Sequence, residues 1–226
     1  MTDRFRHDFN KLNRLPPYLL SEVTELTRSR RRAGEVIIVL GMGIPDLASP
    51  PHVIDKICEA ARDPRNHRYS SSQGLPNLRA GITEWYKRRY DVDFDPATEA
   101  VAVIGAKEGL SHFVLMTIGP GDVVLVPDPA YPIHRYSVII AGADLRTVPL
   151  TSESDFIENL EQAVSRTWPR PKMLIVSFPA NPTTHIVDLA FFERIVDFAK
   201  ANELMVLHDF AYAEIAFDGY KPPSIF

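Results

Sequence analysis

Cysteine is nearly absent from this sequence of 226 residues, in which Cys58 is the single one. One cysteine excludes an internal disulfide framework and a zinc site built from cysteines alone, and it is typical of a reducing compartment. No apolar run reaches the ~18 residues of a membrane-spanning helix. The first ten residues contain no apolar signal-peptide core. We therefore expect a cytoplasmic protein with no membrane partner.

A basic excess is lacking too, since 25 Lys and Arg residues stand against 29 Asp and Glu residues. Nucleic-acid-binding domains usually carry a basic surface, so we expect no nucleic-acid partner. The seven histidines show no metal-ligand spacing, and no G-x-S-x-G nucleophile motif occurs. Gly41 and Gly43 imitate a dinucleotide-binding loop, but Asp46 occupies the third glycine position, where an acid would repel pyrophosphate. We therefore expect neither a metal site nor a dinucleotide site.

Short apolar runs alternate with helical runs from residue 100 onward. Apolar strands separated by helices of about ten or more residues predict an α/β fold, with a mainly parallel sheet and helices on both faces. A further helix is predicted over 18–32. Ligands of such sheets bind beyond the carboxyl ends of the strands. The predicted strands are 100–104, 122–126, 144–148, 173–178 and 204–207, and the helices between them are 107–118, 132–141, 155–168 and 189–201.

The residues after the first two strands suit a phosphate and a planar ring. Ala106 and Lys107 open a helix directly after Gly105, and the N–H groups of a helix N-terminus attract anions. Tyr131 stands in a loop stiffened by prolines, where its ring could lie flat on a ligand. Each feature also has a plainer interpretation, namely an exposed lysine in an ordinary turn and a tyrosine of the core.

The residues after the last two strands add polar groups. The amide of Asn181 can donate to a ligand oxygen, although Asn-Pro also simply favours a turn. Asp209 ends a buried strand, where a carboxylate is costly unless it is paired, so it could hold a protonated ring nitrogen beside the Tyr212 phenol or cap a turn. His208 could orient Asp209 or be a satisfied core histidine. As a set, these groups suit a phosphorylated, nitrogen-containing aromatic, and pyridoxal phosphate fits each of them.

Six motifs follow one another in an order that resembles the class I/II, fold-type I, pyridoxal-phosphate-dependent aminotransferases. They are GMGIPD (41–46), RYSSSQGLPNLR (68–79), GAKEGL (105–110), VPDPAYPIH (126–134), FPANPT (178–183) and HDFAY (208–212). The stretches RLPPYLLSEVTEL and DPAYPIH look closest to bacterial alanine (glutamate–pyruvate) aminotransferases. The resemblance implies an arm with part of a small domain over 1–45 and an incomplete large domain over 46–226.

The resemblance also implies a role for each matching residue in a homodimer that binds pyridoxal 5'-phosphate. Asp209 would keep the ring nitrogen protonated, and Tyr131 would stack on the ring. Tyr69 would reach the phosphate of the other subunit. The remaining contacts would be Ala106 and Lys107 to the phosphate, Asn181 and Tyr212 to the ring hydroxyl oxygen, and Gly43 and Tyr18 to the substrate.

One part of the family pattern is missing, because no lysine matches the one that forms a Schiff base with the cofactor. Lys172, Lys200 and Lys221 are the only lysines after Lys107, and none stands in such a motif. We expect that lysine, and the arginine that binds the substrate carboxylate, beyond Phe226. The chain alone would then hold no catalytic residue and be inactive.

The resemblance implies that the full protein moves an amino group between alanine and 2-oxoglutarate. Three alternatives stay open: a C–S lyase, a diaminopimelate-type aminotransferase, and a truncated binding module without catalysis. The family topology also implies that the 100–104 strand lacks its neighbours here, while the other four strands still form one sheet. We expect the isolated chain to be poorly stable for that reason.

Overall fold

The computed structural model describes residues 10–41, 43 and 46–226, so that positions 42, 44 and 45 of the first motif lie outside the described residues. The chain divides into two compact units. The larger unit combines the chain up to Leu15 with residues 73–226, and the smaller unit spans Pro16–Ser72. Among the described residues, none of the helices has the length and apolar character that a membrane crossing requires.

The larger unit is built on a four-stranded parallel sheet. Its strands are β1 (Val123–Asp128), β2 (Asp144–Pro149), β3 (Pro171–Ser177) and β4 (Met205–Asp209), in the spatial order β2-β1-β3-β4. All the strand pairs are parallel, so the carboxyl ends of the strands meet at one edge. The predicted parallel sheet is confirmed, and so is the expectation that these four strands form a continuous sheet.

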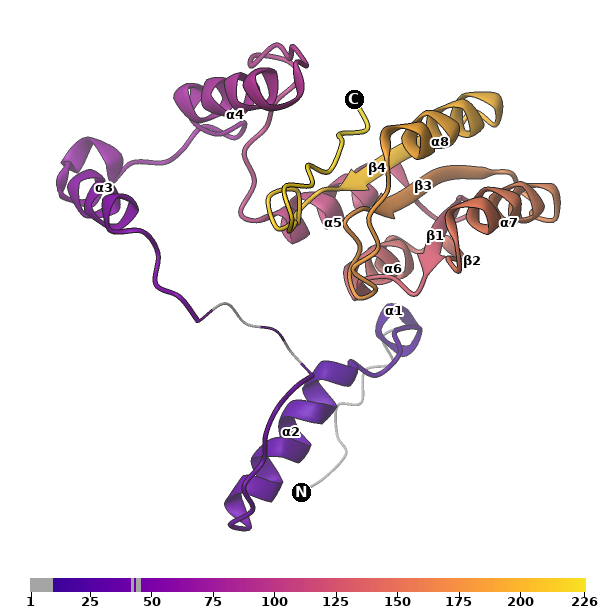
Figure 1. Cartoon of the computed structure of the whole chain (residues 1–226), viewed down its shortest axis with the longest axis horizontal. Coiled ribbons are helices and arrows are strands. Elements are labelled where there is room, and N and C mark those ends of the chain that lie inside the picture. The colour runs from indigo at the N-terminus through magenta and orange to yellow at the C-terminus, as the bar shows by residue number, and fades with distance from the viewer. Residues whose placement is uncertain (1–9, 42, 44–45) are drawn as a thin grey trace. The chain divides into compact units, whose positions relative to one another are not determined.

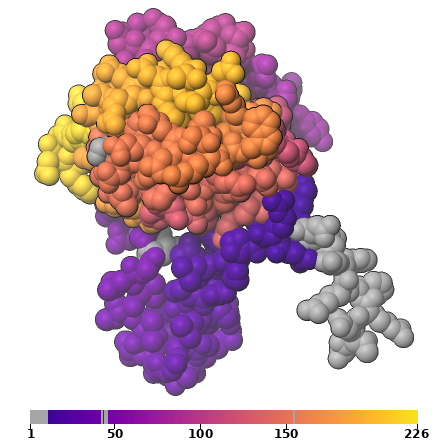
Figure 2. All heavy atoms as spheres, turned by 90° about the vertical axis from the view of Figure 1, so that its right-hand side faces the viewer, coloured from indigo at the N-terminus to yellow at the C-terminus, as the bar shows by residue number. Residues whose placement is uncertain are grey.

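Helices cover both faces of the sheet, as predicted (Figure 1). Helices α5 (Ala106–Thr117) and α6 (Pro132–Ala141) pack on one face, and α7 (Glu153–Ser165) and α8 (Leu189–Ala201) pack on the other. Successive side chains of a strand point to opposite faces. Val124 therefore packs with α5 and α6, whereas Leu125 packs with α7 and α8. Figure 2 shows α7 and α8 side by side over their face.

Local sequence signals set the ends of these helices. Gly142 ends α6 in the left-handed conformation that glycine adopts without strain. The Asp188 side chain accepts a hydrogen bond from Phe191 N and so caps α8. Helix α7 ends at Ser165, three residues before the predicted end at 168. Pro169 disfavours helical backbone at Trp168, the residue that precedes it, and so accounts for the last of these three residues.

The largest differences from the sequence-based expectation lie at residues 100–104 and 76–90. Residues 100–104 form no strand and lie outside the sheet. Apolar composition favours a strand, but a strand also needs a neighbour to pair with. Helix α4 (Pro76–Tyr90) was not predicted, although Pro76 stands at its first position and Leu78, Ile82 and Trp85 recur at helical spacing.

The smaller unit consists of helices with little core. It contains α2 (Leu19–Arg32), α3 (Pro51–Arg62) and the short 3₁₀ helix η1 (Pro64–Asn66), while α1 (Asn10–Asn13) belongs to the larger unit. The helix predicted over 18–32 is confirmed. Neither α2 nor α3 contains a buried residue. The domain boundary proposed at residue 45 stays a prediction.

Candidate functional site

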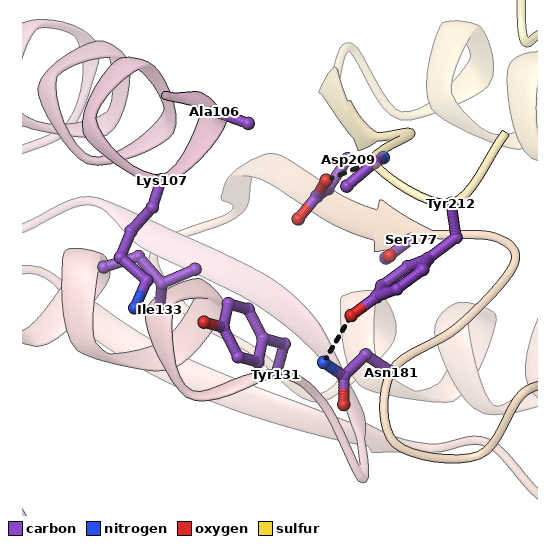
Figure 3. Close-up of a pocket in the computed structure, with 9 residues that line it drawn as sticks. Ala106, Lys107, Tyr131, Ile133, Ser177, Asn181, Asp209 and Tyr212 are labelled. Atoms are coloured by element: carbon purple, nitrogen blue, oxygen red, sulfur yellow. Dashed lines mark hydrogen bonds between the residues drawn. The ribbon is translucent and has the colours of Figure 1, made fainter. Parts of the chain in front are cut away.

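A pocket of about 200 Å³ lies at the carboxyl ends of β3 and β4, next to the first turns of α5 and α6 (Figure 3). Six of its nine lining residues are the predicted strand-end candidates, and three others are new. The lining residues are Ala106, Lys107, Tyr131, Ile133, Ser177, Asn181, Asp209, Ala211 and Tyr212.

One end of the pocket favours a negatively charged group. Gly105 precedes α5 with a φ of 85°, a value that L side chains rarely adopt, and Ala106 and Lys107 form the first turn. The N-terminal turn of a helix presents backbone N–H groups and the positive end of the helix dipole. The Lys107 ammonium lies over the Tyr131 ring, 5.3 Å from its centroid, which is a cation–π contact. A helix N-terminus and a lysine thus meet beside an aromatic ring.

The opposite side of the pocket carries an ionised carboxylate. Asp209 Oδ2 lies 2.9 Å from His134 Nε2, and the Ala211 N–H donates to Asp209 Oδ1 at 3.2 Å. Burial acts to raise the pKa of Asp209, but the hydrogen bond and electrostatic attraction of His134, together with the Ala211 N–H and the nearby His208, outweigh it and hold that pKa below its usual value. Asp209 is therefore a carboxylate at neutral pH and can hold a protonated ring nitrogen.

The histidine that holds Asp209 is His134, which sequence reasoning missed. Its side chain is only 2% exposed, and that of Asp209 is 14% exposed. Because a carboxylate accepts, the proton of the His134 ring is assigned to Nε2. The available signal was the end of the VPDPAYPIH motif, which places His134 one helical turn after Tyr131.

His208 is the satisfied core histidine of the two alternatives that the sequence left open. Its Nε2 lies 3.2 Å from the Phe178 carbonyl oxygen. Its ring centroid lies 4.9 Å from that of Phe192 and 4.8 Å from that of Phe210. Burial lowers the pKa of His208 to about 4, so the ring is neutral at pH 7 and donates from Nε2 to the carbonyl.

Two polar side chains converge on the pocket from the loops after β3 and β4. Asn181 Nδ2 donates to Tyr212 Oη at 3.2 Å, and Figure 3 shows both side chains directed towards Tyr131. Ser177 lies deeper and was missed because the sequence analysis placed it inside a strand. Register pairs Ser177 with Asp209 on the adjacent parallel strand, which puts both side chains on the same face.

Three predicted site residues belong to the smaller unit. These are Tyr18, Gly43 and Tyr69. The Tyr69 side chain is fully exposed, and no atom would lie within 4 Å of a Cβ added at Gly43. The binding roles given to these three residues stay predictions.

The lysines after Lys107 lie away from the pocket. Lys172 opens β3 at the end opposite the pocket, and its Nζ forms an ion pair with Asp122 Oδ2 at 3.2 Å. Lys200 and Lys221 are exposed, and neither is among the residues that line the pocket. Within the described ranges, no group of three or more His, Cys, Asp or Glu residues could hold a metal ion.

Comparisons with known proteins agree with this arrangement. The family model for aminotransferase class I and II matches residues 35–225. Glutamate-pyruvate aminotransferase AlaC of Escherichia coli K12 is 51% identical over 217 residues, which are 96% of this chain and 53% of that protein. An LL-diaminopimelate aminotransferase of Moorella thermoacetica is 42% identical over 214 residues, which are 95% of this chain and 55% of that protein.

Solved structures share the fold. Substrate-bound BacF from Bacillus subtilis superimposes with a TM-score of 0.87 at 31% identity, over 98% of this chain and 56% of that one. The N-succinyldiaminopimelate aminotransferase of Mycobacterium tuberculosis gives a TM-score of 0.83 at 27% identity, over 97% of this chain and 56% of that one. The chain spans about half the length of the curated relatives that it matches.

Proposed function

The chain belongs to the class I and II aminotransferases, and from this premise we propose that the protein containing it is a pyridoxal-phosphate-dependent transaminase. One observation carries the proposal. Six residues singled out from four separate segments of the sequence line a single pocket, in which Asp209 is ionised and Tyr131 faces Asn181 and Tyr212. The enzyme class follows from the family, and the cofactor from the chemistry of this pocket.

The pocket fits pyridoxal 5'-phosphate in three respects. The ionised Asp209 suits a protonated ring nitrogen, Tyr131 suits the face of the ring, and the first turn of α5 with Lys107 suits the phosphate. Asn181 and Tyr212 would bind the ring hydroxyl oxygen. When bound, this cofactor supplies an electron-accepting ring that stabilises the charge left on the substrate carbon after a proton departs.

In this proposal, the residues of this chain bind and orient the cofactor and do not perform the covalent step. His134 fixes the Asp209 carboxylate, and Asp209 keeps a proton on the ring nitrogen. The covalent step needs an amine that Lys172, Lys200 and Lys221 do not supply. We place that lysine, and the arginine for the substrate carboxylate, beyond Phe226, in the length of the relatives that this chain does not span. Tyr69 would complete the site of the other subunit in a homodimer, with Gly43 and Tyr18 at the substrate.

Alanine and 2-oxoglutarate are the proposed substrate pair. The support is 51% identity to a glutamate-pyruvate aminotransferase, against 42% to an LL-diaminopimelate aminotransferase. The second identity extends over 95% of the chain, which makes LL-diaminopimelate the second candidate for the amino donor.

Comparing the two donors under identical conditions tests the substrate proposal. The full-length enzyme is purified, and glutamate formation from 2-oxoglutarate is measured with alanine and, separately, with LL-diaminopimelate. We expect the higher kcat/KM with alanine. A higher kcat/KM with LL-diaminopimelate would make LL-diaminopimelate the assigned amino donor and leave the enzyme class unchanged. Pyruvate and ammonia released without any keto-acid acceptor would indicate a lyase, and no reaction in any assay would indicate a binding module.

A further inference from the structure

The short segment that leads into the phosphate end of the pocket packs closely against two glycines. Residues 102–104 lie just before Gly105 and α5, outside the strands that pair. Each of the three residues contacts a different neighbour. Ala102 and Val103 lie close to glycines, and Ile104 forms a hydrogen bond to a glutamate. We call residues 102–104 the lead-in segment.

Gly74 allows the first residue of the lead-in segment to approach the backbone of the preceding loop. Ala102 N donates to the Gln73 carbonyl oxygen at 3.0 Å. A Cβ added at Gly74 would lie 2.3 Å from the Ala102 Cβ and 3.3 Å from its Cα. Since the alanine side chain cannot rotate away, any side chain at position 74 would push the two backbones apart. Gly74 also has a φ of 87°, which L side chains rarely adopt.

Gly109 allows the second residue, Val103, to pack directly on the backbone of α5. This glycine lies inside α5, where helix propensity alone would favour alanine. A Cβ added at Gly109 would lie 2.9 Å from Val103 Cγ2, 3.1 Å from Cγ1 and 3.3 Å from Cβ. Because all three side-chain atoms of Val103 are this close, no rotation about its χ1 bond relieves the contact. Either the lead-in segment or the start of α5 must move.

Glu108 holds the third residue. Its Oε2 accepts a hydrogen bond from Ile104 N at 3.1 Å, and its Oε1 lies 2.6 Å from His112 Nδ1. The lead-in segment is therefore tied to the loop at Gly74 and to α5 at two points. The next residue along the chain is Gly105, and it is followed by Ala106 and Lys107, which line one end of the pocket.

We infer that Gly74 and Gly109 are positioning residues, which set the place of the α5 N-terminus and thereby the affinity of the pocket for a phosphate group. The inference rests on the proposed function, because it assigns these residues to the phosphate end of the same site. It predicts that a side chain at either position weakens the binding of a phosphorylated ligand and spares the part of binding that does not involve phosphate.

The test compares two ligands that differ only in phosphate. The full-length protein, freed of cofactor, is titrated with pyridoxal 5'-phosphate and with pyridoxal, and both dissociation constants are measured by fluorescence. Gly109→Ala should weaken binding of pyridoxal 5'-phosphate by about tenfold or more, because a displaced α5 N-terminus loses hydrogen bonds to the charged phosphate, and one such bond corresponds to roughly that factor in affinity. Binding of pyridoxal should change by less than about twofold, since its contacts lie elsewhere in the pocket.

The chain offers a matched control and a rescue. Gly81 is a helical glycine of α4 with open space around its Cβ position, so Gly81→Ala should leave both dissociation constants unchanged. Adding Val103→Ala to Gly109→Ala removes the clashing γ-carbons and should restore the phosphate-dependent affinity. If Gly109→Ala does not fold, Val103→Ala alone loosens the same contact and should cause a smaller loss of the same kind.

Each contrary outcome has a distinct meaning. Equal weakening of both ligands, together with a lower melting temperature, would overturn the inference, since it would show a structural role only. Unchanged affinities in Gly109→Ala and Gly74→Ala would overturn it as well, while leaving the proposed function in place. If the unsubstituted protein bound neither ligand, the proposed function itself would fail and the inference with it.

Discussion

Removing His134 should raise the pKa of Asp209 and weaken the binding of a protonated ring nitrogen in the pocket. The two side chains are almost buried, and the bond between His134 Nε2 and Asp209 Oδ2 is 2.9 Å long. His134→Leu deletes the hydrogen bond, which is the largest contribution that lowers the pKa of Asp209. Burial, which raises that pKa, remains. The carboxylate then ionises less readily and holds a protonated ring nitrogen less well.

The size of the effect follows from the kind of bond that is lost. A hydrogen bond to a charged group contributes about 1.5–3 kcal/mol, which corresponds to about a 10- to 100-fold change in affinity. We expect His134→Leu to weaken binding of pyridoxal 5'-phosphate by that factor and to move its pH dependence upward. His134→Gln, whose amide can still donate, should recover part of the loss. His52→Gln, at an exposed position of α3, is the control.

Binding titrations from pH 5 to pH 8 measure this effect directly. A uniform loss of affinity at every pH, equal in His134→Leu and His134→Gln, would refute the reasoning, because it would indicate lost packing rather than a changed carboxylate. So would a His134→Leu protein that binds as tightly as the original.

Three further predictions concern stability. The pKa of His208 is about 4 in the folded chain against a usual value of 6.5. The free energy of unfolding should therefore be highest above pH 6.5 and fall by about 3 kcal/mol as the pH drops to 4. Urea unfolding measures this fall, and His208→Phe should reduce it. Asp188→Ala removes the cap at Phe191 N and should cost about 1 kcal/mol and lower Tm by about 2–4 °C, whereas Glu193→Ala on the exposed side of α8 should not. The isolated 226-residue chain should aggregate on size-exclusion chromatography, because β4 is an edge strand with Met205 42% exposed; a soluble monomer with a sharp, high-temperature melt would contradict this.

Local signals made much of the fold predictable. The predicted bounds of α6 and α8 coincide with the structure, because Pro132 and Gly142 punctuate one helix and Asp188 caps the other. The strand predicted at residues 100–104 does not form, and the missing neighbours that the family topology implied are the reason, since composition reports strand propensity but not the neighbour that a strand needs.

The candidate site was predictable as far as it follows the sheet. Tyr131, Asn181 and Asp209 follow the ends of predicted strands within a few residues, and parallel strands bring their carboxyl ends together. His134 and Ser177 were not found, because one lies inside a helix and the other inside a strand. Their directions depend on helix rotation and strand register, which strand-end reasoning does not use.

The most direct test of the central claim is the intact mass of the full-length protein, made from its native locus, after borohydride reduction, followed by peptide mapping of any adduct. We predict one reduced pyridoxyl-phosphate adduct, on a lysine beyond Phe226, and loss of that adduct in an Asp209→Ala variant purified in the same way. An unmodified mass, or an adduct that maps to Lys172, Lys200 or Lys221, none of which lines the pocket, would contradict the account of this pocket as the cofactor site.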